Sequence, residues 1–275
     1  MTIANLKTVL DYANFENIGI VGFVVHGWED ARAFVRAGET IKVPIILQAG
    51  PKSRDHTPLS VLGKMFRVLA SESEQDVVLH LDHAKELRTC QNALDEGFTS
   101  IMFDGSQLEL SENIKMTQKV CKLVQPYNAS VEAEIGYVGY SEIDKNRATK
   151  ATDIKKFLPE VEIDALAISV GNTHLQEKTE ATINYSKLSQ INKITNIPLV
   201  VHGASGISTK NRKKMLKFFG VKKFNIGTEV RKQFGQTLRR ELHVNKNNYD
   251  RLKLLSAVEN DLKFKAISLL KEISQ

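Results

Sequence analysis

Eight short runs of apolar and β-branched residues recur along the chain, separated by stretches long enough to form helices. Most runs are continuously apolar, which is typical of parallel strands covered on both faces. Such an alternation predicts a closed (β/α)8 TIM barrel, and 275 residues suit one barrel of about 250 residues. The runs are Ile18–Val25, Val43–Gln48, Val77–Asp82, Thr99–Phe103, Ala129–Glu134, Asp164–Val170, Ile197–His202 and Val221–Ile226.

The segments between the runs carry helical patterns. An open doubly wound sheet is the alternative architecture, but no glycine-rich dinucleotide loop follows the first run. No linker or repeat divides the chain, so we expect residues 1–275 to form one domain with a C-terminal helical extension. The expected helices are Glu29–Ala37, Pro58–Glu72, Glu86–Glu96, Ser111–Leu123, Thr152–Phe157, Tyr185–Thr195, Ser208–Phe219 and Tyr249–Ile273.

Composition argues against a secreted, membrane or nucleic-acid-binding protein. The N-terminus lacks a signal-peptide pattern, and no window reaches the ~18 apolar residues of a membrane span. With two cysteines, no disulfide scaffold is predicted, and a cytoplasmic protein is expected. The net charge of +6 includes the basic stretch Lys210–Lys217, but without interleaved aromatic residues we interpret it as a solvated helix face.

Polar residues collect at the C-terminal ends of the runs, where barrels of this kind carry their chemistry. Among the seven histidines, His80 lies near the end of the third run and His83 directly follows it, His174 follows the sixth run and His202 ends the seventh. A lone histidine there is more often a structural residue, whereas three that face one mouth favour a metal. Catalytic zinc takes three protein ligands and keeps one position open. We therefore expect Zn²⁺ on His83, His174 and His202.

A loop of small residues, Gly203–Gly206, follows His202 and leads into a helix. Small residues let backbone N–H groups approach an anion, and a helix N-terminus favours negative charge. Barrels often bind phosphate after their seventh and eighth strands. A tight turn alone would also use small residues, but beside a metal histidine this loop predicts a phosphate site.

With these motifs the chain resembles the class II, zinc-dependent ketose-bisphosphate aldolases, which include fructose-bisphosphate and tagatose-bisphosphate aldolases. The similarity runs from Asn5 to the C-terminus and is carried by VVLHLDHA at Val77–Ala84 and VEAEIGYVGYSE at Val131–Glu142. Further blocks in the same order are Gly97–Leu108, Asp164–His174, Ile197–Ile207 and Phe224–Glu229.

The resemblance implies a reversible retro-aldol cleavage of a phosphorylated ketose to dihydroxyacetone phosphate and an aldehyde, through a zinc-stabilised enediolate. It implies that His83, His174 and His202 are the zinc ligands and that Glu134 ligates the metal in some states. Asp82 matches the acid/base at the C4 hydroxyl, and Glu142 matches the residue that transfers a proton at C3.

The resemblance also implies a binding site for the ketose phosphate, a monovalent cation near that phosphate, and a homodimer or homotetramer. The residues matching the phosphate site are Gly171, Gly203, Ser205, Asn225, Gly227 and Thr228, and weaker matches to substrate contacts are Gln48, Lys178 and Arg251.

Several positions depart from the family pattern and bear on the substrate. Val24 stands where an asparagine is usual, Gly50 where a serine is usual, and Leu175 and Tyr140 where glycines are usual. We therefore expect a divergent member that acts on a non-standard phosphorylated substrate.

Two other functions stay open at this stage. A metal-dependent hydrolase on the same fold often has an HxH pair after the first strand, where this chain has only His26. A non-catalytic binding or regulatory paralogue would tolerate the substitutions above, but it would not need three ligands and two carboxylates.

Overall fold

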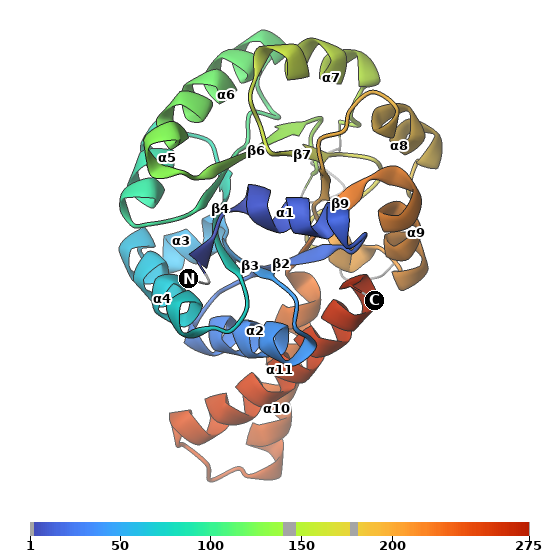
Figure 1. The fold of residues 1–275 in the computed structure, drawn as a ribbon. Helices are drawn as coiled ribbons and strands as arrows, with labels where there is room; N and C mark the ends of the chain where they lie inside the picture. The colour runs from blue at the N-terminus through green and yellow to red at the C-terminus, as the bar shows by residue number, and fades with distance from the viewer. Residues whose placement is uncertain (1–2, 140–146, 177–180, 275) are drawn as a thin grey trace.

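The structure, a computed structural model, describes residues 3–139, 147–176 and 181–274. Eight parallel strands close into a ring in the order β4-β3-β2-β9-β8-β7-β6-β5, with β4 pairing β5, and this confirms the predicted barrel (Figure 1). A short strand, β1 (Ile3–Ala4), adds to β4. The barrel strands are β2 (Ile20–Val24), β3 (Ile45–Ala49), β4 (Val77–Ala84), β5 (Ser100–Phe103), β6 (Ser130–Ile135), β7 (Ala165–Ile168), β8 (Leu199–Val201) and β9 (Val221–Ile226).

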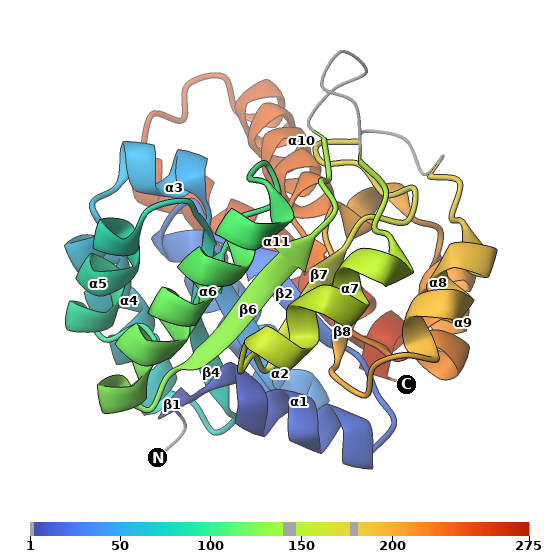
Figure 2. The same cartoon turned by 90° about the horizontal axis from the view of Figure 1, so that it is seen from above.

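Helices surround the barrel, as Figure 2 shows from a second direction. All eight predicted helices are present, and the predicted C-terminal one corresponds to α11 (Arg251–Ser274). Unpredicted helices are α1 (Leu6–Phe15), α3 (Pro51–His56) and α10 (Thr228–Val244), besides the short 3-10 turns η1 (Gln125–Tyr127), η2 (Leu158–Glu160) and η3 (Ala204–Gly206). The others are α2 (Trp28–Ile41), α4 (Leu59–Glu72), α5 (Leu87–Asp95), α6 (Leu110–Val124), α7 (Ala151–Phe157), α8 (Tyr185–Asn192) and α9 (Thr209–Phe219).

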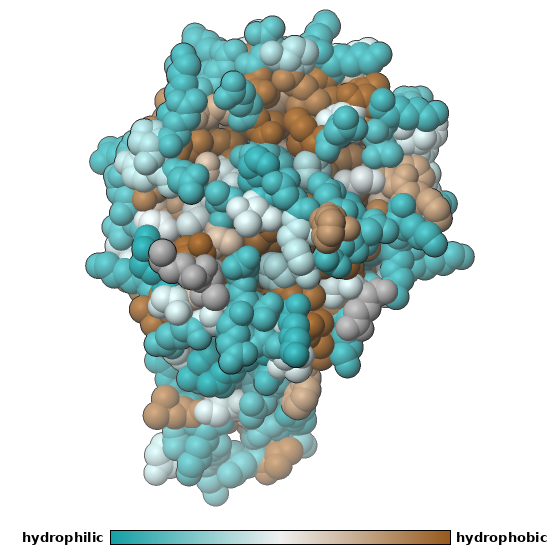
Figure 3. Space-filling model, viewed as in Figure 1, coloured by the Kyte–Doolittle hydropathy of each residue, from teal (hydrophilic) through white to brown (hydrophobic). Residues whose placement is uncertain are grey.

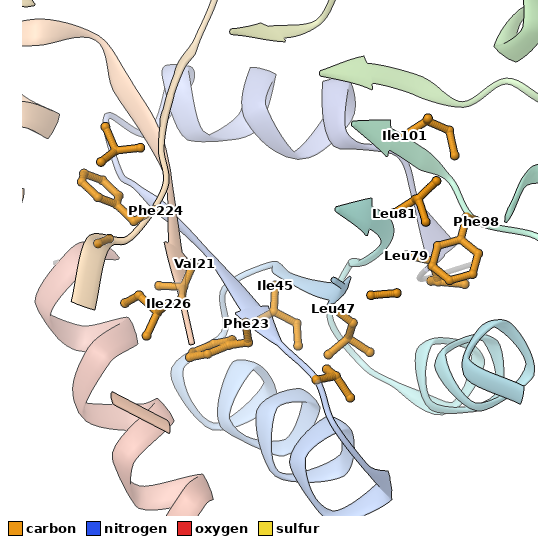
Figure 4. Packing of buried hydrophobic residues seen from close by; sticks show 14 of the residues in the cluster. Val21, Phe23, Ile45, Leu47, Leu79, Leu81, Phe98, Ile101, Phe224 and Ile226 are labelled. Atoms are coloured by element: carbon orange, nitrogen blue, oxygen red, sulfur yellow. The ribbon is translucent and has the colours of Figure 1, made fainter. Parts of the chain in front are cut away.

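The larger part of the core lies between strands and helices, because alternate strand residues point outward. Figure 4 shows part of this layer, in which Phe23 of β2 and Phe224 of β9 face the surrounding helices. The ring of Phe23 stacks on Phe34 of α2 with centroids 4.4 Å apart. This packing holds the strands in register and so fixes where their C-terminal ends lie.

A second, smaller apolar cluster fills the N-terminal end of the barrel interior. Helix α1 begins after Asn5, whose side chain caps it by accepting from the backbone N–H of Thr8 at 2.9 Å. Its buried face packs against inward-pointing residues such as Ile46 and Val78, and it lies across this end of the barrel (Figure 1). Polar residues inside the barrel are therefore confined to its middle and its opposite end.

Helices α10 and α11 form a hairpin that projects beyond the barrel next to α2 (Figure 1). Figure 3 shows hydrophobic residues at the surface of this projection, where Val244 and Leu252 are each 76 % exposed. Within residues 3–139, 147–176 and 181–274, no helix combines the length and the apolar character needed to cross a bilayer.

Candidate active site

An irregularity in β4 brings two consecutive side chains to the mouth of the barrel. Consecutive strand residues normally point to opposite faces, but the register of β4 against β5 shifts between Leu81 and Ala84. Within this shift His83 has φ 50, a left-handed conformation that is uncommon outside glycine and that clusters at functional sites. As a result both Asp82 and His83 line the same cavity.

Two further histidines meet His83 at this mouth. His202 follows β8 directly, and His174 lies in the loop after β7, where its backbone N–H donates to Gly139 O at 2.9 Å. Gly203 lets the two segments come together: its φ is 62, and a Cβ there would collide with the Thr173 carbonyl oxygen. The ring centroids of His83 lie 5.0 Å from His174 and 4.6 Å from His202.

The three imidazoles fit a metal ion of the zinc type. Their ligand atoms all lie within 4.8 Å of one another, and His83 Nε2 is 2.8 Å from His202 Nδ1. In two of the rings, the nitrogen that faces away from the other ring contacts a carboxylate. His83 Nδ1 is 2.9 Å from Asp104 Oδ2, and His202 Nε2 is 3.1 Å from Glu132 Oε1. Carboxylates behind ligating histidines are a recurring feature of metal sites, since they fix the tautomer and orient the ring.

The electrostatics of the cluster also favour a cation. Burial opposes a charge on His83, but Asp82, Asp104 and Glu134 outweigh it and raise the pKa of His83 to about 9. Burial together with His83 lowers the pKa of His174 and of His202 well below the ordinary value, so these two rings are neutral donors.

A carboxylate on β6 stands next to the histidines. Glu134 belongs to a second group of candidate ligands, with His83 and Asp104, whose atoms also lie within 4.8 Å of one another. Its Oε1 accepts from the Val138 N–H at 3.2 Å, while its Oε2 has no hydrogen-bond partner among the described residues. Burial and the nearby Asp104 raise the pKa of Glu134 to about 8. Glu134 is therefore positioned beside the histidine cluster rather than within it.

The cavity at the mouth has a volume of about 560 Å³ and is lined by most of the expected residues. Asp82 lies in its wall, with Oδ1 3.5 Å from Asn225 Nδ2. The small-residue loop forms the turn η3, and Ser205 Oγ accepts from the backbone N–H of Glu229 at 3.2 Å, which ties this loop to α10. The other expected residues that line it are His83, His174, His202, Gly203, Gly227 and Thr228.

Other predicted residues lie elsewhere. Gly171 and Gln48 do not line this cavity, and Gln48 is fully buried with both amide atoms lacking a hydrogen-bond partner in the described chain. Arg251 borders a neighbouring cavity of about 370 Å³. Glu142 and Lys178 lie outside the described residues.

Sequence reasoning missed a polar layer directly beneath the histidines. Lys223 of β9 is fully buried, with Nζ 2.6 Å from Glu132 Oε2 and 3.0 Å from His80 Nε2. Asp104 was also overlooked, although it follows a predicted strand. A signal existed for Glu132, because Glu132 and Glu134 are two residues apart on a strand and so share a face.

Comparison with known proteins agrees with this geometry. A model of the family "Fructose-bisphosphate aldolase class-II" matches residues 4–274. The 6-phospho-5-dehydro-2-deoxy-D-gluconate aldolase of Bacillus subtilis is 33 % identical over 258 residues, covering 91 % of this chain and 88 % of that protein. The sulfofructosephosphate aldolase of Alkalicoccus urumqiensis is 31 % identical, covering 88 % of this chain and 86 % of the relative. Among solved structures, the YdjI aldolase of Escherichia coli K12 superposes with a TM-score of 0.86 at 26 % identity, covering 98 % of this chain and 97 % of that one.

Proposed function

The chain belongs to the class II fructose-bisphosphate aldolase family, whose named members are lyases. From this premise we propose that it is a zinc-dependent aldolase, which cleaves a phosphorylated ketose reversibly to dihydroxyacetone phosphate and an aldehyde. One observation carries the proposal: three imidazoles converge beside the Asp82 carboxylate in the wall of a single cavity. Family membership favours this reaction over hydrolysis and over a non-catalytic role.

The residues His83, His174 and His202 would hold the ion. Glu134 Oε2 lies 3.8 Å from His83 Nδ1, and its role as a ligand in some states is assigned by resemblance. Bound there, zinc would supply a Lewis acid for the ketose oxygens and for the negative charge left by carbon–carbon cleavage. Asp104 and Glu132 would keep His83 and His202 in their ligating tautomers.

Asp82 is the group that we assign to the proton at the scissile bond. During cleavage its carboxylate accepts the proton of the C4 hydroxyl, and during condensation it returns that proton to the aldehyde oxygen. Asn225 Nδ2, 3.5 Å from Asp82 Oδ1, helps to orient the carboxylate. Proton transfer at C3 is assigned to Glu142 by resemblance alone.

The phosphate of the ketose is assigned to the side of the cavity formed by Gly203, Ser205 and Thr228. Thr228 is the first residue of α10, a helix whose N-cap position, Gly227, has no side-chain cap. The positive end of such a helix, together with the small-residue turn, favours a dianionic group.

The substrate itself is proposed to be non-standard. Val24 and Gly50 remove polar groups from the cavity wall, in agreement with a ketose other than fructose 1,6-bisphosphate. The names of two relatives denote a phosphorylated gluconate derivative and a sulfonated fructose phosphate, which shows that those proteins act on acidic sugar phosphates.

The proposal is tested by the exchange of a C3 proton of dihydroxyacetone phosphate in heavy water, which requires no knowledge of the aldehyde. We expect the zinc-loaded protein to catalyse this exchange and to condense dihydroxyacetone phosphate with an aldehyde. Asp82→Asn should lower the rate of condensation by about 10²- to 10⁴-fold because it removes an acid/base group, and His174→Ala should lose zinc in metal analysis.

Asp55→Asn, which changes an exposed carboxylate on α3, serves as the control and should behave like the wild type. A zinc-loaded protein that binds dihydroxyacetone phosphate but exchanges no proton would favour the non-catalytic alternative. Release of inorganic phosphate without carbon–carbon cleavage would favour the hydrolase.

A further inference from the structure

We propose that Arg212 of α9 is a positioning residue for the phosphate site, because it holds the turn η3 and the start of α10 in place relative to each other. The inference rests on the proposed function, which assigns the ketose phosphate to these two elements. Arg212 is buried and does not line the cavity, so it would act on the ligand through its neighbours.

The guanidinium of Arg212 contacts three different elements. Its Nε donates to Ala204 O of η3 at 3.0 Å, its Nη1 donates to Glu272 Oε1 of α11 at 3.1 Å, and its Nη2 pairs with Glu229 of α10. The three nitrogens lie in one rigid plane, so their contacts constrain how the three elements are placed. The turn and the helix start that are assigned to the phosphate are therefore held by the same side chain.

The turn η3 also packs closely against the loop after β7. A Cβ on Gly203 would collide with Thr173 O, and a Cβ on Gly206 would collide with the side chain of Gln176. The turn has little room to shift toward this loop, and the contact with Arg212 adds a second constraint on its position.

Glu229 links the same turn to α10. Its backbone N–H donates to Ser205 Oγ at 3.2 Å, which leaves the hydroxyl hydrogen of Ser205 for a phosphate oxygen. Its carboxylate pairs with Arg212 and, at 2.6 Å, with Lys265 of α11. Burial opposes ionisation of Glu229, but Arg212 and Lys265 outweigh it and lower its pKa. The residue that orients Ser205 is thus itself held by Arg212.

The cluster of Arg212, Lys265, Glu229 and Glu272 balances its charges, because two cations pair with two carboxylates. A buried ion cluster adds little net stability over well-packed apolar residues, since its charged groups lose their hydration. A neutral cluster also adds no net charge that would attract a phosphate. These two arguments favour a role in placing the turn over a role in stability or in long-range attraction.

The competing interpretation is that Arg212 only fastens α11 to the rest of the barrel. Arg32 offers a matched comparison, because it joins α2 to the same helix. Both of its described hydrogen bonds go to Glu259, and its Nε is 2.8 Å from Glu259 Oε1. A variant of Arg32 therefore loosens α11 without touching the phosphate turn.

Arg212→Lys keeps the charge balance, but a lysine cannot hold three acceptors in one plane. We expect the zinc-loaded variant to bind dihydroxyacetone phosphate about tenfold more weakly in calorimetry, as the loss of one hydrogen bond to a charged group provides. The kcat of C3 proton exchange at saturating dihydroxyacetone phosphate and the zinc content should stay close to those of the wild type.

Arg32→Lys makes the same chemical change at the other anchor of α11, and it should leave the Kd for dihydroxyacetone phosphate unchanged. Glu272→Gln weakens one anchor of the guanidinium and leaves Arg212 in place. It should also raise the Kd, and it provides the test if Arg212→Lys does not fold.

A Kd that stays at the wild-type value in both Arg212→Lys and Glu272→Gln would overturn the inference. A Kd raised equally by Arg32→Lys would overturn it too, because the docking of α11 would then be the cause. A lower kcat with an unchanged Kd would likewise contradict a role at the phosphate site.

The proposed function fails in a different way. A zinc-loaded wild type that binds dihydroxyacetone phosphate but exchanges no proton would refute the aldol reaction, while the Kd values of the variants would still decide the role of Arg212. A wild type that does not bind dihydroxyacetone phosphate would refute the phosphate site and this inference with it.

Discussion

A chain of hydrogen bonds beneath the histidine cluster fixes the tautomers of two rings. Lys223 Nζ donates to His80 Nε2, so His80 uses its Nδ1–H toward Ser100 Oγ at 2.8 Å. Lys223 also pairs with Glu132, whose other oxygen accepts from His202 Nε2. His202 is thereby left with an unprotonated Nδ1 on the side that faces His83.

The buried pair of Lys223 and Glu132 should be costly to break. Lys223→Met leaves a buried carboxylate without its counter-ion, and we expect a loss of about 3–5 kcal/mol in the free energy of unfolding. Zinc affinity should fall by about 10- to 100-fold, because His202 loses part of its orientation. Urea unfolding and zinc competition assays measure the two effects.

Lys222→Met is the matched control on the same strand. The Lys222 ammonium contacts the side-chain oxygen of Asn17 at 3.1 Å, so its loss should cost about 1 kcal/mol. Similar destabilisation in the two variants would contradict the prediction that the ion pair inside the barrel contributes more to stability than the contact of Lys222 with Asn17.

Zinc uptake should depend on pH through His83. Its pKa of about 9 in the absence of metal means that the ring is protonated near neutrality, and it must lose that proton to bind a cation. Affinity should therefore rise by about tenfold per unit between about pH 6 and pH 8, with about one proton released per ion. Calorimetry in buffers of different ionisation enthalpy measures this release.

Asp104→Asn should weaken that pH dependence, since Asp104 helps to raise the pKa of His83. Zinc affinity that is the same at both ends of this pH range would contradict the assignment of His83 as the protonated ligand.

At the scale of elements, α11 is fastened to α2 by a buried carboxylate. Glu259 is 4 % exposed and binds Arg32 Nε at 2.8 Å and Arg36 Nη1 at 2.9 Å. Glu259→Gln should lower the free energy of unfolding by about 1–3 kcal/mol, because it weakens charged hydrogen bonds at a buried position. Thermal unfolding measures the change.

Asp11→Asn removes the exposed ion pair between Asp11 and Lys7 on α1, and it should cost at most about 0.5 kcal/mol. If this variant were destabilised as much as Glu259→Gln, the prediction that a buried ion pair stabilises the fold more than an exposed one would be wrong.

The elements found from the sequence are those with strong local patterns. Most of the strands from β2 to β9 are largely apolar runs, and the surrounding helices begin and end at recognisable residues, such as Ser208 and Gly220 around α9. Helix α1 was missed although Leu6, Val9, Leu10 and Ala13 have helical spacing. Helix α3 has six residues and no comparable pattern.

At the scale of the whole molecule, the convergence of the histidines followed from topology, because parallel strands of a closed barrel end at one mouth. The partners of those histidines could not be predicted in this way. Glu132 and Lys223 are 91 residues apart, and only the closed barrel brings them together.

The projecting hairpin of α10 and α11 belongs to the same scale. Tyr249 is 96 % exposed between its helices, near Val244 and Leu252. Helix α10 also carries Arg231 into the cavity, so this hairpin connects a protruding apolar surface with the substrate site. The expected homodimer or homotetramer stays a prediction.

The irregular pleat at Asp82 and His83 has a consequence for protein engineering. In a regular β4 the side chain of His83 would enter the apolar shell beside Leu79 and Leu81, while Asp82 stayed inside. Copying the histidines and the carboxylate into another barrel scaffold would therefore not reproduce this centre. The donor strand must be transplanted with its backbone defect, because that defect turns two neighbours in sequence into neighbours in space.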